Sequence, residues 1–205
     1  DVGRVFDVRA ARDDNDAWSR NRGPRYDGSS IRVGLPPADE LEFFGDDEMC
    51  RAHSAFREQL AGTVTVDEVS LEPFLAAGSL LYQGPWVAER LVEFGDFLAA
   101  QPESIHPVVR DILRGGLAYT AVDAFAALQR LQELKAVVAR VWEHIDVLVV
   151  PTIGTTFTVE EVLAQPIDCN TTLGHYTHFG NLLDLLGVAV PVGTTAGGRP
   201  CSAML

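Results

Sequence analysis

Two short apolar runs near the C-terminal end constrain the fold more than any other feature of this chain. They are VLVV at 147–150 and VAVPV at 188–192, both rich in the β-branched residue valine. Neither run alternates with polar residues as a half-exposed strand does, so both are predicted to be strands covered on two sides. Pro151 and Pro191 lie at or near the ends of the runs, where a strand tolerates a missing N–H. The pattern predicts an α/β protein with a mixed β-sheet covered by helices.

The region before these runs reads as a β-α-β unit followed by helices. Residues 31–35 are predicted to be a strand closed by Pro36-Pro37, and 63–69 alternates imperfectly, as expected of a strand nearer a sheet edge. Between them, Asp46 is suited to cap a helix that ends before Gly62, where glycine favours the C′ position. We expect a right-handed crossover if the two strands are parallel.

Helices are predicted for most of residues 70–142. One runs over about 72–81 and ends before Gly84-Pro85, a second begins at Pro85, and a third runs from Pro107 to the two glycines at 115 and 116. A long amphipathic helix follows, opened by a capping pair of Thr120 and Asp123. The expected buried faces are Trp86, Ala88, Leu91 and Leu98 in the second helix, and Ala121, Phe125, Leu128, Leu131, Val138 and Trp142 in the long helix.

Composition excludes several classes of protein. The chain has 205 residues, 47% of them hydrophobic, which favours one domain with a sizeable core. A net charge of −13 argues against a nucleic-acid or anionic-membrane surface. No apolar run approaches the roughly 20 residues that span a bilayer, and residues 1–25 lack the order of a signal peptide. Three cysteines without CxxC spacing, Cys50, Cys169 and Cys201, are expected to be free thiols in a reducing cytoplasm.

Four stretches carry a resemblance to a known family. They are IRVGLPPADELEFFGDDE at 31–48, LLYQGPWVAERL at 80–91, DVLVVPTIGTTFTVEEV at 146–162 and NTTLGHYTHFGNLLDLLGVAVPVG at 170–193. The last two resemble amidase-signature hydrolases in general. The first two are similar to the allophanate hydrolases in particular. The resemblance implies that residues 1–205 are a single partial amidase-signature domain, with a surface connection at 1–30 and an α/β core at 31–205.

The resemblance also exposes a gap in the catalytic residues. Amidase-signature enzymes act through a Ser, cis-Ser, Lys triad with its serines in a loop rich in glycine and serine. The only lysine here is Lys135, in an amphipathic helical pattern, and Gly28-Ser29-Ser30 lies in a polar linker. No residue of this chain is therefore assigned a catalytic role. The expectation is a downstream piece of the amidase domain, with the nucleophile upstream.

Metal and cofactor sites are not predicted. His175 and His178 are three residues apart and could share a helix face, but no third ligand with metal spacing accompanies them. There is no Gly-rich phosphate loop and no G-x-S-x-G motif. A packing role is the simpler interpretation of both histidines, and no cofactor is expected.

Tyr82 and Arg90 are the candidate substrate-binding residues. They flank the predicted helix break at Gly84-Pro85, so the corner can bring both towards one pocket. A guanidinium binds a planar carboxylate through two parallel N–H bonds, which an ammonium cannot copy. The resemblance implies that both residues contact allophanate, a small planar carboxylate. The alternative is a surface Arg90 paired with Glu89 or Glu93, and a Tyr82 that only packs.

Three functions stay open at this level. The first is a segment of an allophanate hydrolase that hydrolyses the amide of allophanate during urea degradation. The second is part of another amidase, or of an amidotransferase glutaminase-type subunit, without the Tyr82 and Arg90 clamp. The third is a non-catalytic binding or assembly module. The expected partner is a small-molecule substrate, with no nucleic acid and no membrane, and a homo-oligomer is left open.

Overall fold

The computed structural model describes residues 2–20 and 30–205 and divides into two units, 1–31 and 32–205. In the first unit α1 (Val2–Arg9) is followed by turns in which Ser19 accepts a hydrogen bond from the backbone N–H of Asp13 at 2.8 Å. The segment expected to be a surface connection therefore begins with a helix. Residues 21–29 of the predicted connection, which include Gly28 and Ser29, lie outside the described residues.

A parallel sheet opens the second unit and contains the predicted β-α-β unit. Its strands are β1 (Val33–Leu35), β2 (Val66–Glu68) and β3 (Val147–Leu148), in the order β2-β1-β3, and α2 (Asp47–Ala61) connects β1 to β2. Asp46 caps α2 by accepting a bond from the N–H of Met49 at 3.0 Å, so the predicted cap is confirmed. Gly62 ends the helix in a right-handed conformation, with φ of −76°, so the left-handed C′ geometry that favours glycine is not used.

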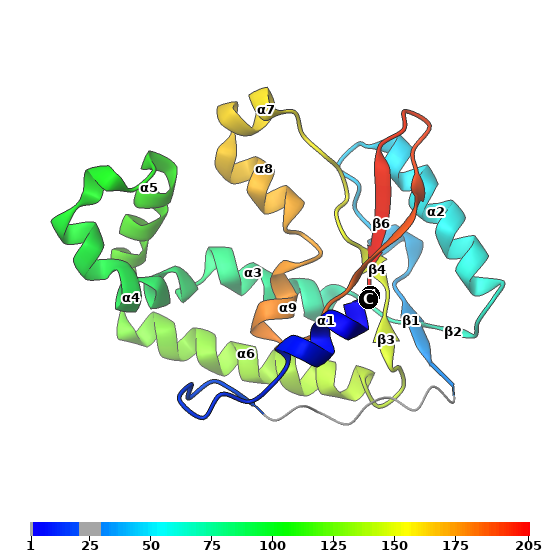
Figure 1. Ribbon diagram of the computed structural model, residues 1–205, viewed down its shortest axis with the longest axis horizontal. Helices are drawn as coiled ribbons and strands as arrows, with labels where there is room; N and C mark the ends of the chain where they lie inside the picture. The colour runs from blue at the N-terminus through cyan, green and yellow to red at the C-terminus, as the bar shows by residue number, and fades with distance from the viewer. Residues whose placement is uncertain (1, 21–29) are drawn as a thin grey trace. The chain divides into compact units, whose positions relative to one another are not determined.

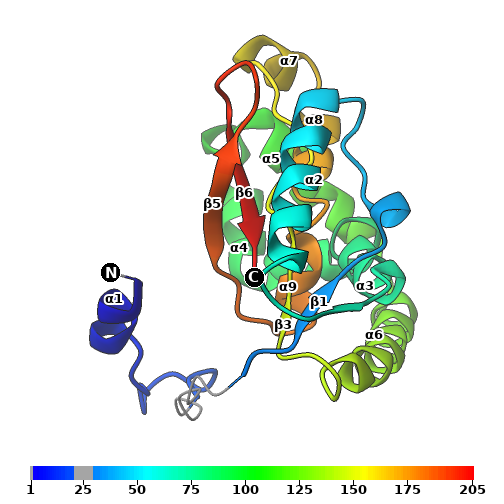
Figure 2. The same cartoon turned by 90° about the vertical axis from the view of Figure 1, so that its right-hand side faces the viewer.

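The apolar run at 147–150 divides between two sheets. Val149 separates β3 from β4 (Val150–Pro151), which belongs to an antiparallel sheet of order β4-β6-β5 with β6 (Pro200–Met204) and β5 (Ala189–Thr194). β4 is buried, as predicted for this run. The prediction of a buried strand at 188–192 is wrong, because β5 pairs with β6 alone among the described strands and most of its residues are exposed. Figure 2 shows α2 alongside the β5–β6 hairpin.

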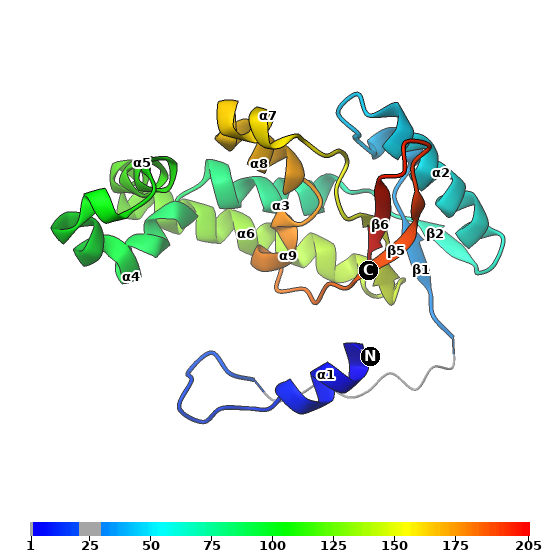
Figure 3. The same ribbon diagram turned by 45° about the horizontal axis from the view of Figure 1, so that its top comes forward.

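Helices form the other half of this unit (Figure 1). They are α3 (Glu72–Gln83), α4 (Trp86–Ala100), α5 (Pro107–Gly115), α6 (Ala121–Val141), α7 (Val159–Ala164), α8 (Pro166–Leu173) and α9 (His178–Leu182), with short 3₁₀ turns at Ala38–Glu40, Pro102–Ser104 and Gly116–Ala118. The capping box of Thr120 and Asp123 at the start of α6 is confirmed. Helices α3, α6 and α9 gather around the main core (Figure 3), where Phe74 and Phe179 meet edge to face at 5.5 Å.

The predicted buried face of α6 is correct only in its second half. Leu131 and Val138 are buried, but Phe125 is 73% exposed and Leu128 is 48% exposed. The buried stripe instead passes through Ala127, Leu131, Leu134 and Val138, at helical spacings of three and four residues. In α4 only Leu98 of the four expected residues is fully buried, and Trp86, Ala88 and Leu91 are half-buried.

An open apolar groove of about 610 Å³ lies beside the sheets, lined by residues such as Val147, Leu186, Val190 and Leu205. Leu186 is 72% exposed. The three cysteines are free thiols, as predicted. In residues 2–20 and 30–205, no helix is both long enough and apolar enough to cross a membrane.

Candidate functional site

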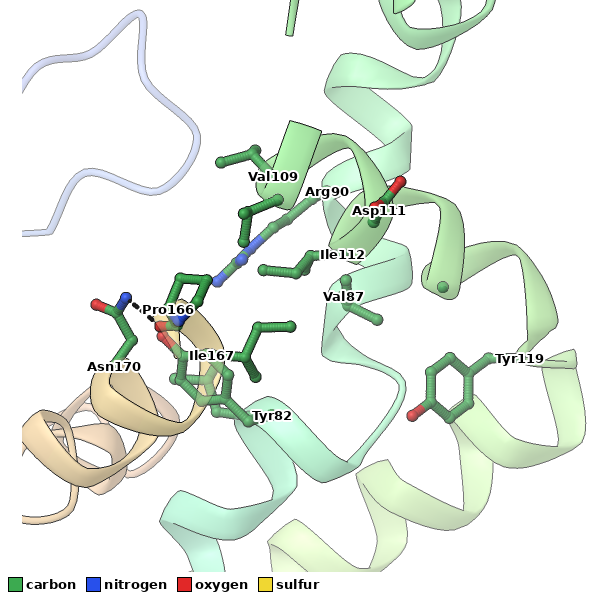
Figure 4. Close-up of a pocket in the computed structure, with 13 residues that line it drawn as sticks. Tyr82, Val87, Arg90, Val109, Asp111, Ile112, Tyr119, Pro166, Ile167 and Asn170 are labelled. Carbon is green, nitrogen blue, oxygen red and sulfur yellow. Dashed lines mark hydrogen bonds between the residues drawn. The ribbon is translucent and has the colours of Figure 1, made fainter. Parts of the chain in front are cut away.

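Tyr82 and Arg90 line one cavity of about 370 Å³ (Figure 4). The cavity lies between the end of α3, the start of α4, α5 and the start of α8. Its wall is mostly apolar, and a few polar groups converge on it, as is usual for small-molecule sites. The lining residues are Leu81, Tyr82, Val87, Arg90, Val108, Val109, Asp111, Ile112, Gly115, Tyr119, Pro166, Ile167 and Asn170.

The corner between α3 and α4 brings the two candidates together. A Cβ on Gly84 would overlap the carbonyl oxygen of Leu80, so the chain leaves α3 along a path that only glycine allows. Pro85 then occupies the N-cap of α4, where its missing N–H costs nothing. Tyr82 lies in the last turn of α3 and Arg90 in the second turn of α4. The predicted geometry of the Gly84-Pro85 corner is therefore found.

Arg90 is an exposed cation whose guanidinium extends across the cavity towards the start of α8 (Figure 4). Within residues 2–20 and 30–205, Arg90 makes no hydrogen bond and no ion pair. The alternative of a surface pair with Glu89 or Glu93 is accordingly not found in this part of the chain. In a chain with a net charge of −13, an unpaired guanidinium on a cavity wall is available to an anionic ligand.

Tyr82 is 44% exposed, and its ring lies against the imidazole of His178. The two ring centroids are 4.3 Å apart and the planes are inclined by 37°. Burial, and next the neighbouring His175, lower the pKa of His178 below its ordinary value, so its imidazole is neutral near pH 7. The phenol hydroxyl makes no hydrogen bond to the described residues and is free to meet a ligand.

The other titratable groups give no metal site. Across residues 2–20 and 30–205, no group of three His, Cys, Asp or Glu side chains is placed to hold a metal ion. His175 packs edge to face against Phe44 and Tyr176 at 5.4 and 4.7 Å. His53 is 1% exposed between Phe43 and Phe56, and burial lowers its pKa to about 4.

Sequence reasoning missed the wall that α8 contributes to the cavity. Pro166, Ile167 and Asn170 lie far along the chain from Arg90, and only the tertiary fold brings them opposite it. The Asn170 side-chain amide donates to the carbonyl oxygen of Pro166 at 2.7 Å, so it is fixed to its own helix. The sequence gives no signal that Asn170 lies on the cavity wall, because a polar residue on a short helix is most often exposed to solvent.

Comparison with known proteins first defines the class of fold. A solved amidase is 22% identical and superposes with a TM-score of 0.67 over 88% of this chain and 42% of its own. At that identity the likeness shows the fold alone. The chain thus has the α/β fold of part of an amidase-signature domain, as predicted. No protein-family model matches it.

More specific relatives carry the resemblance further. Urea amidolyase of Saccharomyces cerevisiae is 34% identical over 207 residues, which cover 98% of this chain and 11% of that protein. Solved Kluyveromyces lactis allophanate hydrolase is 31% identical, with a TM-score of 0.91 over 100% of this chain and 34% of its own. This chain is a homologue of allophanate hydrolase and corresponds to part of it, so the predicted resemblance is confirmed. It spans about a tenth of the curated relative's length.

Proposed function

We propose that this chain is part of an allophanate hydrolase and supplies the clamp for the substrate carboxylate. The reaction is hydrolysis of an amide C–N bond of allophanate during urea degradation. The attacking serine and its lysine lie outside residues 1–205. They act through an acyl-enzyme intermediate, as is typical of amidase-signature enzymes. The homology over the whole chain and the cavity shared by Tyr82 and Arg90 support this proposal.

One observation carries the clamp: the guanidinium of Arg90 and the phenol of Tyr82, neither hydrogen-bonded to any described residue, line the same cavity. Allophanate joins a planar carboxylate to a ureido group. Arg90 binds both carboxylate oxygens through parallel N–H bonds, and the Tyr82 hydroxyl donates a hydrogen bond to the same anion. A cavity of about 370 Å³ encloses so small a substrate with room for the reacting groups of the complete domain.

The two remaining functions are less well supported. A general amidase or a glutaminase-type subunit would share the fold but would not need a cation at the position of Arg90. A non-catalytic assembly module would need neither an unpaired guanidinium nor a cavity. The cytoplasm remains the proposed compartment because Cys50, Cys169 and Cys201 are free thiols.

The clamp can be tested in a chimaera in which this chain replaces the matching third of Kluyveromyces lactis allophanate hydrolase. Arg90→Lys keeps the charge and removes the fork. Losing charge-assisted bonds worth about 1.5–3 kcal/mol should lower kcat/KM for allophanate by about one to two orders of magnitude. Arg90→Ala should cost at least as much, and Tyr82→Phe, which removes one hydrogen bond to the anion, should cost about tenfold.

Biuret is the matched control substrate, because it has an amide in place of the carboxylate. Its turnover, where the unsubstituted chimaera shows any, should change little with Arg90→Lys. Equal losses for allophanate and biuret would mean that Arg90 acts through folding, and the clamp would be rejected. Unchanged kcat/KM for allophanate in Arg90→Ala would reject it as well.

A further inference from the structure

The imidazole of His178 is the surface on which the Tyr82 ring rests. The centroid separation of 4.3 Å is just below the usual range of about 4.5–7 Å for paired aromatic rings, so the contact is close. The two residues come from different elements, since Tyr82 lies in α3 and His178 begins α9. An exposed tyrosine otherwise keeps the freedom of its χ1 and χ2 torsions, and a ligand that uses its hydroxyl would have to order it on binding.

Two glycines make room for this contact. Gly78 lies one turn before Tyr82 on the same face of α3. A Cβ there would lie 3.1 Å from the backbone nitrogen of Phe179 and 3.2 Å from the Cβ of His178, so the glycine lets α9 pack closely on α3. A Cβ on Gly174 would overlap the imidazole of His178 itself. The ring is thus held between the backbone at Gly174 and the ring of Tyr82.

The position of His178 suits a residue that supports the Tyr82 ring and does not itself contact a ligand. Its side chain is half-buried and does not line the cavity, whereas Tyr82 does. The side chains of Tyr82 and His178 share no hydrogen bond in the described part of the chain, so the phenol hydroxyl is not diverted from the cavity. A flat, neutral ring that packs on the phenol at an inclination of 37° orients it without accepting a hydrogen bond from its hydroxyl.

We propose that His178 is a positioning residue, which holds the Tyr82 ring against the cavity so that its hydroxyl is ordered before the substrate arrives. Gly78 and Gly174 serve this role by allowing the imidazole its place. The inference rests on the proposed function, in which Tyr82 meets the carboxylate of allophanate. It extends the site to α9, beyond the residues that line the cavity.

A double-mutant cycle in the chimaera tests the proposal. Loss of an ordering contact should raise KM for allophanate about threefold to fivefold in His178→Leu, within the range that aromatic pairs contribute, with kcat changed less. His178→Phe keeps a flat ring and should restore KM to near its original value. Gly174→Ala leaves His178 in the sequence but displaces its ring, so it should raise KM as His178→Leu does.

The decisive measurement is His178→Leu in the Tyr82→Phe background. If His178 acts through the tyrosine hydroxyl, the double variant should be no worse than Tyr82→Phe alone. Multiplicative losses would overturn the inference, as would equal KM values for His178→Phe and His178→Leu. Melting temperatures of all variants identify losses caused by unfolding. If Tyr82→Phe itself leaves KM and kcat unchanged, the part of the proposed function assigned to Tyr82 fails, and this inference fails with it.

Discussion

Arg199 and Arg32 in the sheet region, formed by the two sheets with α2, are used in the opposite way to Arg90 in the cavity region, formed by α3, α4, α5 and α8. In the sheet region Arg199 donates to both carboxylate oxygens of Asp46, at 2.6 and 2.8 Å. Arg32 likewise donates to both carboxylate oxygens of Asp146, at 2.8 and 3.1 Å. In the cavity region Arg90 has no such partner among the described residues. A paired cation fixes the fold, and an unpaired one on a cavity wall is left for a ligand.

The tie between Arg199 and Asp46 joins three segments that are distant in the sequence. Asp46 caps α2, Arg199 belongs to the turn between β5 and β6, and Thr155, which follows β4, donates its hydroxyl to Asp46 at 3.0 Å. Glu48 accepts from the N–H of Gly197 in the same turn at 3.2 Å. The hydrogen bonds from Arg199 hold the pKa of Asp46 well below its ordinary value, so the carboxylate stays charged in mild acid.

The largest expected effect on stability is the response of the sheet region to acid. Burial lowers the pKa of His53 from 6.5 to about 4, and neither ring nitrogen has a partner in the described structure. Between these values the unfolded chain binds a proton that the folded chain excludes, so stability falls as the pH falls from 6.5 to 4. The shift corresponds to about 3 kcal/mol. Denaturant unfolding at pH 7 and pH 4.5 measures most of it.

The matched variant for this prediction is His53→Leu, which cannot titrate. The lowered pKa values of His175 and His178 have the same sign and leave a residual slope. The carboxyl of Asp46 titrates below this window. A variant whose stability still falls as steeply as the parent's between pH 6.5 and 4 would show that His53 is not the source.

A smaller loss is expected from Asp46→Ala. The change removes the cap of α2 and leaves Arg199 without its main partner. The Asp46 side chain is only 10% exposed, but the Arg199 side chain is 36% exposed, which reduces the cost. We expect the free energy of unfolding to fall by about 2 kcal/mol in denaturant titrations. Asp46→Asn keeps a capping oxygen and should lose about half as much, and equal losses would mean that the charge, and not the cap, matters.

The smallest effect is expected for Arg90→Ala, in the cavity region. An exposed side chain without a partner contributes little to folding, so the free energy of unfolding should change by less than about 0.5 kcal/mol. The same variant should lose most of the allophanate activity in the chimaera. A loss of activity without a loss of stability would distinguish the cavity region from the sheet region most clearly. A stability loss as large as that of Asp46→Ala would remove the distinction between the two regions.

Local signals in the sequence predicted local structure well. Asp46 and Thr120 cap the helices that they were expected to cap, and Gly84-Pro85 breaks the chain between α3 and α4. These features depend on residues a few positions apart. The exposure of β5 and of Phe125 could not be predicted in this way, because burial depends on which distant element packs against a given face.

The candidate site shows the same limit. The resemblance placed Tyr82 and Arg90 in one site, and the cavity they share is consistent with that placement. The sequence interpretation gave His178 a packing role, and its ring contact with Tyr82 is visible only once α9 lies on α3. A single histidine three residues after another carries no sign of an aromatic partner so far back in the chain.

The pairing of β1 with β3 also bears on the order in which the chain folds. Arg32 and Asp146 are bonded across a separation of 114 residues, and the helices α2 to α6 lie between them in the sequence. Closing so long a loop costs conformational entropy that only later contacts repay, whereas helices form from near neighbours. We therefore expect the helices α3 to α6 to gather early and the parallel sheet to close late. If Arg32 and Asp146 meet only near the end of folding, substitutions in this pair should act mainly on the unfolding rate, which stopped-flow unfolding measures.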